Sequence, residues 1–470
     1  MNAKILLLPA GLAVLLAGCS LAPKYARPEP PVPADWPKDS AYRDTGTAAG
    51  APTAPDLEWR GFFTDPKLQK IIGMALNNNR DLRLAALNVE RARGLYGIQR
   101  GELFPILEAV GSGRKELVPA WASGDAAGEI TTERYDVKLS VSSWEIDFFG
   151  RIRSLKDRAL EEYLATEQAR RSARILIVSD VANAYLVLAA DRESLRLSES
   201  TLETQRAAYD LVRRRYELGL ASELDLRRAQ MSVDAARVDV ARFMQLAAQD
   251  ENALDLLAGA PVPRDLLPED LGSVRPPEEI SAGLPSEVLL GRPDILAAEH
   301  RLKGANANIG AARAAFFPRI SLTAAFGTAS GDLSGLFGSG SRAWTFSPEA
   351  VLPIFDARTW PALAVSRVDK EIAVAQYERA IQIAFREVAD ALAVRGTVER
   401  QISAQQSLVD ASTRTYRLST VRFEKGIDDY LGVLDAQRSL YAAQHALIAV
   451  HLAGVANQVR LYAVLGGGGE

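Results

Sequence analysis

The stretch from Arg151 to Leu218 contains neither proline nor glycine and is rich in alanine, leucine, arginine and glutamate. This composition favours one uninterrupted α-helix, because these residues lose little conformational freedom in a helix and nothing in the stretch breaks one. At a rise of about 1.5 Å per residue, such a helix is on the order of 100 Å long. No ordinary globular core has that dimension, so the stretch predicts an elongated helical structure.

A second helix should return beside the first one. Gly219 suits the left-handed residue that ends a helix, and Ser222 suits the N-cap of a helix that runs to about residue 257. The C-terminal part repeats this pattern with helices over about 362–425 and 429–465. The return helices and shorter entry helices could stack end to end beside the long ones, giving antiparallel pairs of equal height. A coiled-coil rod or a spectrin-like bundle would use similar helices.

Two segments of the chain resemble two later segments. Residues 81–105 match 294–318, and both end in Phe-Pro, while residues 215–230 match 422–437. The matches come in the same order and at nearly the same spacing, which indicates two copies of one structural half. In each half a helix should end at the Phe-Pro, because proline lacks an N–H and restricts the residue before it.

After each Phe-Pro the periodicity changes from that of a helix to that of a strand. Apolar and polar residues alternate over 135–141, 320–326 and 344–350, and a weaker strand begins at Ile106. Each half therefore predicts a β-hairpin with one apolar and one polar face, joined by a polar loop. Hairpins of transmembrane barrels have this pattern, and so do soluble hairpins that pack on a core.

Aromatic residues near the strand ends favour the membrane alternative, because barrels carry aromatic girdles at the membrane interfaces. These residues are Trp144, Phe148, Phe149, Phe316, Phe317, Trp344, Phe355 and Trp360. Four strands cannot close a barrel, which needs about eight, and an open edge in lipid leaves backbone groups unpaired. The barrel must therefore be shared between chains. Two copies would give eight strands around a filled interior, and three would give twelve around an open lumen.

The N-terminus carries an export signal followed by the single cysteine of the chain. Lys4 precedes a mostly apolar run over 5–17, which is the layout of a secretory signal peptide and is short for a membrane span. The Leu-Ala-Gly before Cys19 resembles the lipobox of bacterial lipoproteins, in which the cysteine is lipidated, and Ser20 after it favours the outer membrane. The alternative is a buried cysteine near an ordinary cleavage site. A proline-rich tether follows over 23–37.

The composition argues against nucleic-acid binding and against catalysis. The formal net charge is −4, which leaves no basic footprint for nucleic acid. The three histidines, His300, His445 and His451, lack the spacing of metal ligands, and no phosphate loop or nucleophile elbow is present. No segment after the signal offers about eighteen consecutive apolar uncharged residues, which excludes a transmembrane helix. We therefore expect no enzyme, no catalytic residue, no metal and no cofactor.

Specific motifs occur along nearly the whole chain: Arg-Pro-Asp-Ile over 292–295, Phe-Phe-Pro over 316–318 and "GIDDYLGVLDAQ" over 426–437. Together they resemble the TolC-type outer-membrane efflux factor family, and within it the OprM-like lipoprotein channels of RND-type tripartite multidrug pumps. The resemblance implies a homotrimer with twelve strands in the outer membrane and twelve stacked helices across the periplasm. It also implies two partners, a periplasmic membrane-fusion adaptor and an inner-membrane RND-type transporter. The rival class is a lipid-anchored structural or adhesion protein.

By the same resemblance, the turns between the long helices form the periplasmic end of the tunnel. Asp428, Asp429 and Asp435 lie by the second turn, where such aspartates imply a closed gate, and Asp428 matches best. Three chains would bring each aspartate into a ring of like charges, which repel one another. The alternative for Asp429, and less so for Asp428, is helix capping alone. The residues that resemble adaptor-contacting tips, or are plain turn residues, are Gly219, Leu220, Gly426 and Ile427.

The expected fold class is mixed, with a transmembrane β-barrel shared by a trimer, four strands per chain, continuous with a long periplasmic α-helical barrel. The expected location is the outer membrane, with a lipid anchor. The expected segments are the signal peptide 1–18, lipidated tether 19–56, equatorial and upper helices 57–103, first hairpin 104–149, first long pair 150–258, linker 259–293, helix 294–316, second hairpin 317–356, second long pair 357–465 and flexible tail 466–470.

Overall fold

A computed structural model of the chain describes residues 20–42, 52, 54, 57–119, 130–281 and 286–469. The expected signal peptide and Cys19 lie outside these residues. The chain divides into two compact units. We call them the sheet unit, which contains Met1–Glu29, Val89–Thr166 and Ala298–Tyr377, and the helical unit, which contains Pro30–Asn88, Glu167–Ala297 and Glu378–Glu470.

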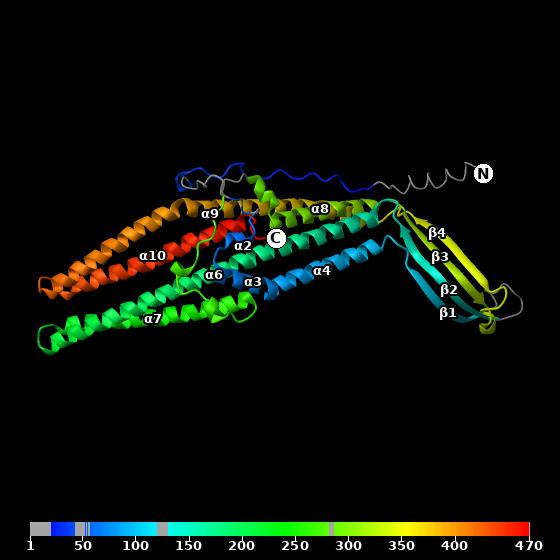
Figure 1. The fold of residues 1–470 in the computed structure, drawn as a ribbon. Coiled ribbons are helices and arrows are strands. Elements are labelled where there is room, and N and C mark those ends of the chain that lie inside the picture. Colours follow the sequence, from blue (N-terminus) through cyan, green and yellow to red (C-terminus); the bar gives the residue numbers. More distant parts are fainter. Residues whose placement is uncertain are drawn as a thin grey trace. The chain divides into compact units, whose positions relative to one another are not determined.

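Two very long helices dominate the described chain (Figure 1). Helix α6 (Arg151–Glu217) has 67 residues and α9 (Thr359–Glu424) has 66, which confirms the predicted uninterrupted helices. Helices α7 (Glu223–Ala258) and α10 (Tyr430–Val464) return beside them. The shorter helices are α2 (Trp59–Phe62), α3 (Pro66–Asn78), α4 (Arg80–Gly101) and α8 (Pro293–Ala314), and the 3₁₀ segments are η1 (Ser40–Tyr42), η3 (Arg264–Leu266), η4 (Leu271–Ser273), η5 (Ser286–Gly291) and η6 (Leu333–Gly335).

The return helices meet the entry helices end to end inside the helical unit. The Asn79 side chain, just before α4, donates a hydrogen bond of 2.9 Å to the carbonyl of Leu257 near the end of α7. Gly259, with φ 71°, lets the backbone of Asn78 approach, because a Cβ there would lie 2.5 Å from the Asn78 oxygen. In the second half, Arg292 before α8 donates to the carbonyl of Val464 at the end of α10 over 2.7 Å. The predicted end-to-end stacking is confirmed at both junctions.

An aromatic cluster closes the second junction. The Tyr462 ring stacks on Phe62 with centroids 4.0 Å apart, and its hydroxyl donates to the carbonyl of Leu57 over 2.5 Å. The prediction of a flexible tail is wrong for Gly466–Gly469. Gly467 and Gly468 are buried, and Gly467 is so close to the Tyr462 ring that any side chain would collide with it. These glycines are needed because the chain end packs against an aromatic ring.

The sheet unit holds one antiparallel sheet in the order β1-β2-β3-β4 (Figure 1). Its strands are β1 (Leu107–Val118), β2 (Ile130–Ile146), β3 (Arg319–Ser330) and β4 (Arg342–Val351). Apolar residues line up across the strands on one face. One row runs Ala109, Leu139, Phe326 and Trp344, and the next runs Leu107, Val141, Ala324 and Phe346. These rows confirm the predicted hairpins with one apolar face.

A β-bulge interrupts β2, and the sequence did not predict it. The pairing shifts between Val141 and Trp144, and Ser143 between them has φ 52° and donates its N–H to the Thr323 hydroxyl over 3.1 Å. One extra residue reverses the alternation, so Trp144 comes to lie opposite Leu322 on the apolar face. The apolar face therefore continues past the point where simple alternation would have ended it.

Two helices contain windows that are long and apolar enough, by length and composition, to cross a membrane. The window in α6 is 61% buried inside the protein and the window in α10 is 22% buried. The sequence-based exclusion of any transmembrane helix is therefore not supported for these two windows. Core helices of soluble proteins can be equally long and apolar.

Candidate functional site

The predicted tip residues form two matching helix ends. Gly219 and Gly426 have φ values of 72° and 73°, which glycine adopts without strain. Leu220 and Ile427 each donate their N–H to a carbonyl five residues earlier, at 2.7 and 2.9 Å. This is the Schellman motif, which satisfies the last carbonyls of α6 and α9. Leu220 is 66% exposed and Ile427 is 59% exposed, so both tips present an apolar side chain to solvent.

Asp428 forms a bidentate ion pair with an arginine of its own chain. Arg422 at the end of α9 donates from Nε and Nη2 to the two carboxylate oxygens of Asp428 at 2.5 and 2.8 Å. This hydrogen bonding lowers the pKa of Asp428, so the carboxylate is ionised at neutral pH. Capping is therefore not the role of Asp428, because its oxygens face a guanidinium group and not a helix N-terminus.

Asp429 is the N-cap of α10. Its Oδ1 accepts the N–H of Gly432 at 3.3 Å, which is the capping role left open as an alternative in the sequence. Asp435 is exposed one turn further along α10, and it makes no hydrogen bond or ion pair with any other described residue. The first turn uses a different cap, because the Ser222 hydroxyl and the Asp225 carboxylate form a reciprocal capping box.

A hydrophobic cluster joins the two tips. Its buried members are Val212, Ala229, Tyr430, Val433 and Leu434, which come from α6, α7 and α10. Arg215 of α6 adds a cation–π contact, with its guanidinium carbon 4.8 Å from the centre of the Phe423 ring of α9. Burial raises the pKa of Tyr430 to about 12. Both helix pairs therefore contribute to one packed tip, with the charged residues around it.

The sequence did not reveal a second polar link above the tips. The Ser198 hydroxyl of α6 lies 2.8 Å from the Tyr441 hydroxyl of α10, which donates to Asp239 of α7 over 3.1 Å. This chain of bonds ties α6, α7 and α10 together. The motif at 292–295 has a similar role, because the Arg292 guanidinium holds Asp294 at 2.7 Å and Glu387 of α9 at 3.0 Å.

Residues 20–29, which we call the anchor strap, follow Cys19 and lie along α8 inside the sheet unit. Glu299 of α8 accepts hydrogen bonds from the Tyr25 hydroxyl at 3.1 Å and from the Arg27 guanidinium at 2.7 Å. Asn306 and Arg313 donate to the carbonyls of Pro23 and Leu21 at 2.8 and 3.0 Å. The strap runs antiparallel to α8, because rising strap numbers meet falling helix numbers. None of these contacts was predicted from the sequence.

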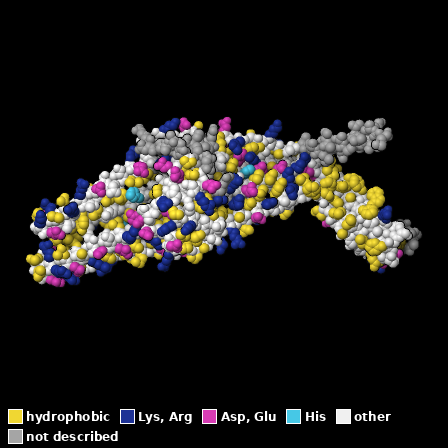
Figure 2. All heavy atoms as spheres, viewed as in Figure 1, with side chains coloured by type: hydrophobic (Ala, Val, Ile, Leu, Met, Phe, Trp, Pro, Cys, Tyr) yellow, Lys and Arg dark blue, Asp and Glu magenta, His cyan; other side chains and the backbone are white. Residues whose placement is uncertain are grey.

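Figure 2 shows hydrophobic side chains concentrated over the strands, whereas charged side chains spread over the helices. The apolar rows of the sheet are strongly exposed in the single chain: Leu139 is 51% exposed, Phe326 59%, Trp344 73% and Phe346 62%. Monomeric soluble proteins rarely expose continuous apolar surface of this kind. This face of the sheet therefore requires an apolar environment, which a lipid bilayer provides.

Comparison with known proteins gives consistent relatives. The family model described as "Outer membrane efflux protein" matches residues 71–260 and 284–467. A probable efflux pump outer membrane protein of Pseudomonas putida, TtgC, is 50% identical over 467 residues, which cover 99% of this chain and 96% of that protein. The outer membrane protein OprJ of Pseudomonas aeruginosa is 42% identical over 460 residues, which cover 97% and 94%.

Solved structures agree with the sequence relatives. The open state of the MtrE outer membrane channel of Neisseria gonorrhoeae has a TM-score of 0.85 and 37% identity, with 96% of this chain and 98% of that chain covered. The outer-membrane channel OprN has a TM-score of 0.87 and 28% identity, with 96% and 100% covered. The four-stranded sheet and the long helices thus occur in known efflux channels. The chain belongs to the outer membrane efflux protein family and is the outer-membrane duct of a tripartite efflux pump, with a transport role and no enzymatic one.

Proposed function

We propose that three copies of this chain assemble into one tunnel, with twelve strands in the outer membrane and twelve stacked helices in the periplasm. The observation that carries this proposal is the open sheet. Within the described residues, β1 and β4 are edge strands, each with one row of backbone groups that pairs with no strand. Unpaired edges cost several kcal/mol per group in lipid, so β1 of one copy should pair with β4 of the next.

The apolar rows support the same assembly. Leu139, Phe326 and Trp344 lie opposite one another on consecutive strands, so closing the sheet into a barrel would extend this row into a continuous apolar belt. A filled barrel of eight strands from two copies would have no open lumen, whereas the family transports molecules outward. The corresponding order of elements in the two halves, α4-β1-β2-α6-α7 and α8-β3-β4-α9-α10, supports an internal duplication and a tunnel of similar halves.

The tip residues would form the periplasmic gate of this tunnel. Asp428 is held by Arg422, Asp429 caps α10, and Asp435 is exposed, so Asp435 is the carboxylate most available to a ring of three. Repulsion within such a ring would need compensating cations or partners. Breaking the pair of Arg422 and Asp428 would release the turn after α9 and loosen the closed end.

The partners follow from this arrangement. Each chain presents two exposed apolar side chains, Leu220 and Ile427, next to Gly219 and Gly426. We expect the tips of a periplasmic membrane-fusion adaptor to bind there. The adaptor would connect the tunnel to an inner-membrane RND-type transporter, which supplies the energy. The names of relatives include antibiotic, toluene and solvent efflux pumps, so we propose drugs and other small molecules as the transported class.

The N-terminal segments would anchor the protein. We expect cleavage of residues 1–18, lipidation of Cys19 and a tether over 19–56. The anchor strap supports this, because it fixes the residues immediately after Cys19 in the sheet unit, which holds the apolar rows. The remaining segments keep their expected roles: upper helices 57–103, hairpins 104–149 and 317–356, long pairs 150–258 and 357–465, linker 259–293 and helix 294–316.

The first experiment measures oligomer mass and planar-bilayer conductance on the same detergent-extracted protein. We expect a trimer with small, mostly closed channels, and larger conductance for Asp428→Ala. Asp410→Ala, which removes an exposed carboxylate from α9 away from the tip, should behave as the unchanged protein. A monomer or rod without conductance would refute the shared barrel. Equal conductance of Asp428→Ala and Asp410→Ala would refute the gate role of Asp428.

A further inference from the structure

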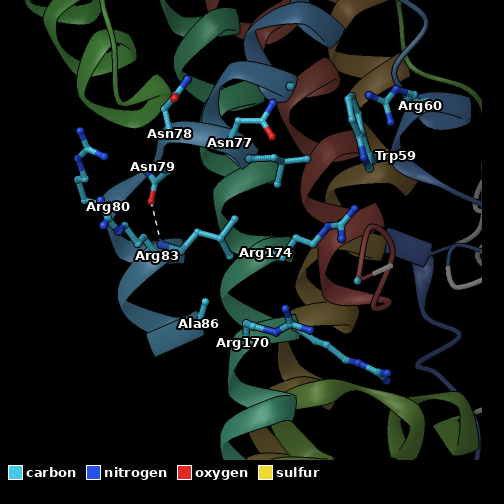
Figure 3. Close-up of a pocket in the computed structure, with 15 residues that line it drawn as sticks. Trp59, Arg60, Asn77, Asn78, Asn79, Arg80, Arg83, Ala86, Arg170 and Arg174 are labelled. Atoms are coloured by element: carbon cyan, nitrogen blue, oxygen red, sulfur yellow. Dashed lines mark hydrogen bonds between the residues drawn. The ribbon is translucent and has the colours of Figure 1, made fainter. Parts of the chain in front are cut away.

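The helical unit contains a pocket of about 900 Å³ whose lining is unusually basic (Figure 3). It lies where α2, the end of α3, the beginning of α4 and the first third of α6 approach one another. Asparagine side chains and the chain end at Gly469 also border it. We call it the arginine pocket, after the six arginines that line it: Arg60, Arg80, Arg83, Arg170, Arg171 and Arg174.

Among the described residues, no aspartate or glutamate lines the arginine pocket, although the whole chain has a net charge of −4. Within the part of the chain that the structure describes, none of the six guanidinium groups forms an ion pair. Elsewhere in the same unit arginines are paired, as Arg192 is with Glu251 at 2.6 Å and Arg292 with Asp294 at 2.7 Å. The concentration of unpaired positive charge is therefore a local feature of this pocket.

Arg174 adds an independent observation. Its Nε is shielded from solvent and has no hydrogen-bond partner. A buried donor without a partner is costly, and this donor belongs to a charged group, which makes the cost larger. An acceptor brought into the pocket would reduce the repulsion among the arginines, and it would reach this buried donor if the Arg174 side chain turned toward the pocket.

A second pocket in the helical unit provides a contrast. Among the described residues, Glu193, Glu278, Glu279 and Glu399 line it, with Arg395 as the single arginine, so its charge has the opposite sign. Its size is comparable, at about 610 Å³. The basic character of the arginine pocket is thus not a general property of cavities in this helical unit.

We propose that the arginine pocket binds a small multivalent oxyanion, that is, a ligand carrying two or more phosphate or carboxylate groups. Guanidinium groups bind both kinds of oxyanion through paired N–H donors. Arginines of α2, α4 and α6 border the space (Figure 3), so a ligand in the pocket would lie against several helices. Bound anion would tie α4 to α6 and thereby stabilise the unit.

The test uses the full-length trimer in neutral detergent, with inorganic pyrophosphate and citrate as probes at low salt. We expect calorimetric binding of at least one probe, a rise in Tm with its concentration, and loss of binding as salt increases. Phosphate preference would show as tighter pyrophosphate binding, and carboxylate preference as tighter citrate binding. A headgroup source is distinguished by adding vesicles of neutral lipid with and without an anionic phospholipid.

Matched variants locate the site. Arg170→Gln and Arg174→Gln should each weaken binding by about tenfold, which corresponds to the loss of one charge-assisted contact. Arg170→Lys should weaken it less, because lysine keeps the charge but not the paired donors. Arg206→Gln removes an exposed arginine from the same helix, outside the pocket, and should bind as the unchanged protein.

Three results would overturn the proposal. The first is no binding of either probe at low salt. The second is equal weakening by Arg206→Gln, which would indicate unspecific attraction of anions. The third is binding only after Glu470 is deleted, which would make the carboxylates of the chain's own end the occupant. Each result leaves the conductance experiment unaffected, so the duct function and this site fail or succeed separately.

Discussion

Replacing Glu299 with glutamine should release the anchor strap from α8. The Glu299 residue is 3% exposed, and its carboxylate accepts from Tyr25, from Arg27 and from Lys303, the last at 3.1 Å. Burial opposes ionisation, but hydrogen bonds from Arg27 and Lys303 outweigh burial and lower the pKa of Glu299. Glutamine keeps the size of the side chain but removes the charge that both cations face.

The magnitude follows from these contacts. A hydrogen bond to a charged group contributes about 1.5–3 kcal/mol, and removing one partner of a fully buried ion pair costs about 3–5 kcal/mol. The Arg27 side chain is 46% exposed, so water already compensates part of its charge. We therefore expect the strap to lose about 2–3 kcal/mol of docking free energy, which is a roughly 30- to 150-fold rise in the detached population.

Trypsin cleavage after Lys24 measures this population, because Lys24 is an exposed residue of the strap and cleavage needs a detached chain. The cleavage rate should rise by the same factor when detachment is fast compared with cleavage. Glu162→Gln, an exposed change on α6 in the same unit, should leave the rate unchanged. An unchanged cleavage rate for Glu299→Gln would refute the conclusion that Glu299 holds the strap on α8.

The free energy with which the anchor strap docks on Glu299 should depend on pH, and the pKa of Glu299 gives the sign of this dependence. The pKa of Glu299 is lower in the folded protein than in the unfolded chain, where it is about 4.3. The stabilisation is therefore fully present above that unfolded value and is lost as pH falls through the folded value. Cleavage of the strap in the unchanged protein should be constant at neutral pH with trypsin and should increase only in acid, where a protease that is active in acid takes the place of trypsin.

Three further predictions test other parts of the molecule. Burial and the neighbouring Asp191 raise the pKa of Asp250 to about 7, so the folded protein keeps a proton that the unfolded chain releases, and stability should fall as pH rises from about 4 to 7. Asp250→Asn should therefore have a higher Tm than the unchanged protein at pH 8 but not at pH 4, and equal Tm values at pH 8 would contradict this. Gly259→Ala should lower the free energy of unfolding, measured with denaturant, by about 1–3 kcal/mol, because the positive φ and the Asn78 carbonyl leave no room for a side chain. A neutral effect would refute the close approach of Asn78. Phe326→Lys should reduce the amount of protein in the outer-membrane fraction, since a charge on the lipid face costs about 2–4 kcal/mol, whereas Ala325→Lys on the opposite face should be tolerated, and equal losses would contradict the assigned lipid face.

The long helices and the apolar strand faces were predictable because each depends on a repeating local pattern. An uninterrupted helix needs only good helix-forming residues without proline or glycine, and α6 satisfies this over its whole length. The helix ends were equally local, since Gly219 and Gly426 both adopt the left-handed conformation that glycine favours. The end-to-end stacking followed from helix lengths alone.

Features that depend on contacts between distant residues were not predictable. The anchor strap needs Glu299, which lies more than 270 positions from Arg27 in the sequence. The bulge at Ser143 is set by pairing with β3, and alternation along β2 alone gives no sign of it. The glycines after Leu465 were interpreted as a flexible tail because glycine runs are flexible in isolation, whereas the Tyr462 ring gives them a packing role.

The two halves of the chain share their order of elements but differ in the chemistry of their tips. The turn after α6 is followed by a capping box of Ser222 and Asp225. This box satisfies backbone N–H groups at the start of α7 and does not involve α6. The turn after α9 instead ties Asp428 back to Arg422, so an ion pair connects this turn to the helix before it. Because an ion pair responds to a competing charge and a capping box responds much less, a charged partner or a change in ionic strength acts first on the tip of α9 and α10. The asymmetry therefore assigns different sensitivities to two turns that have nearly the same backbone.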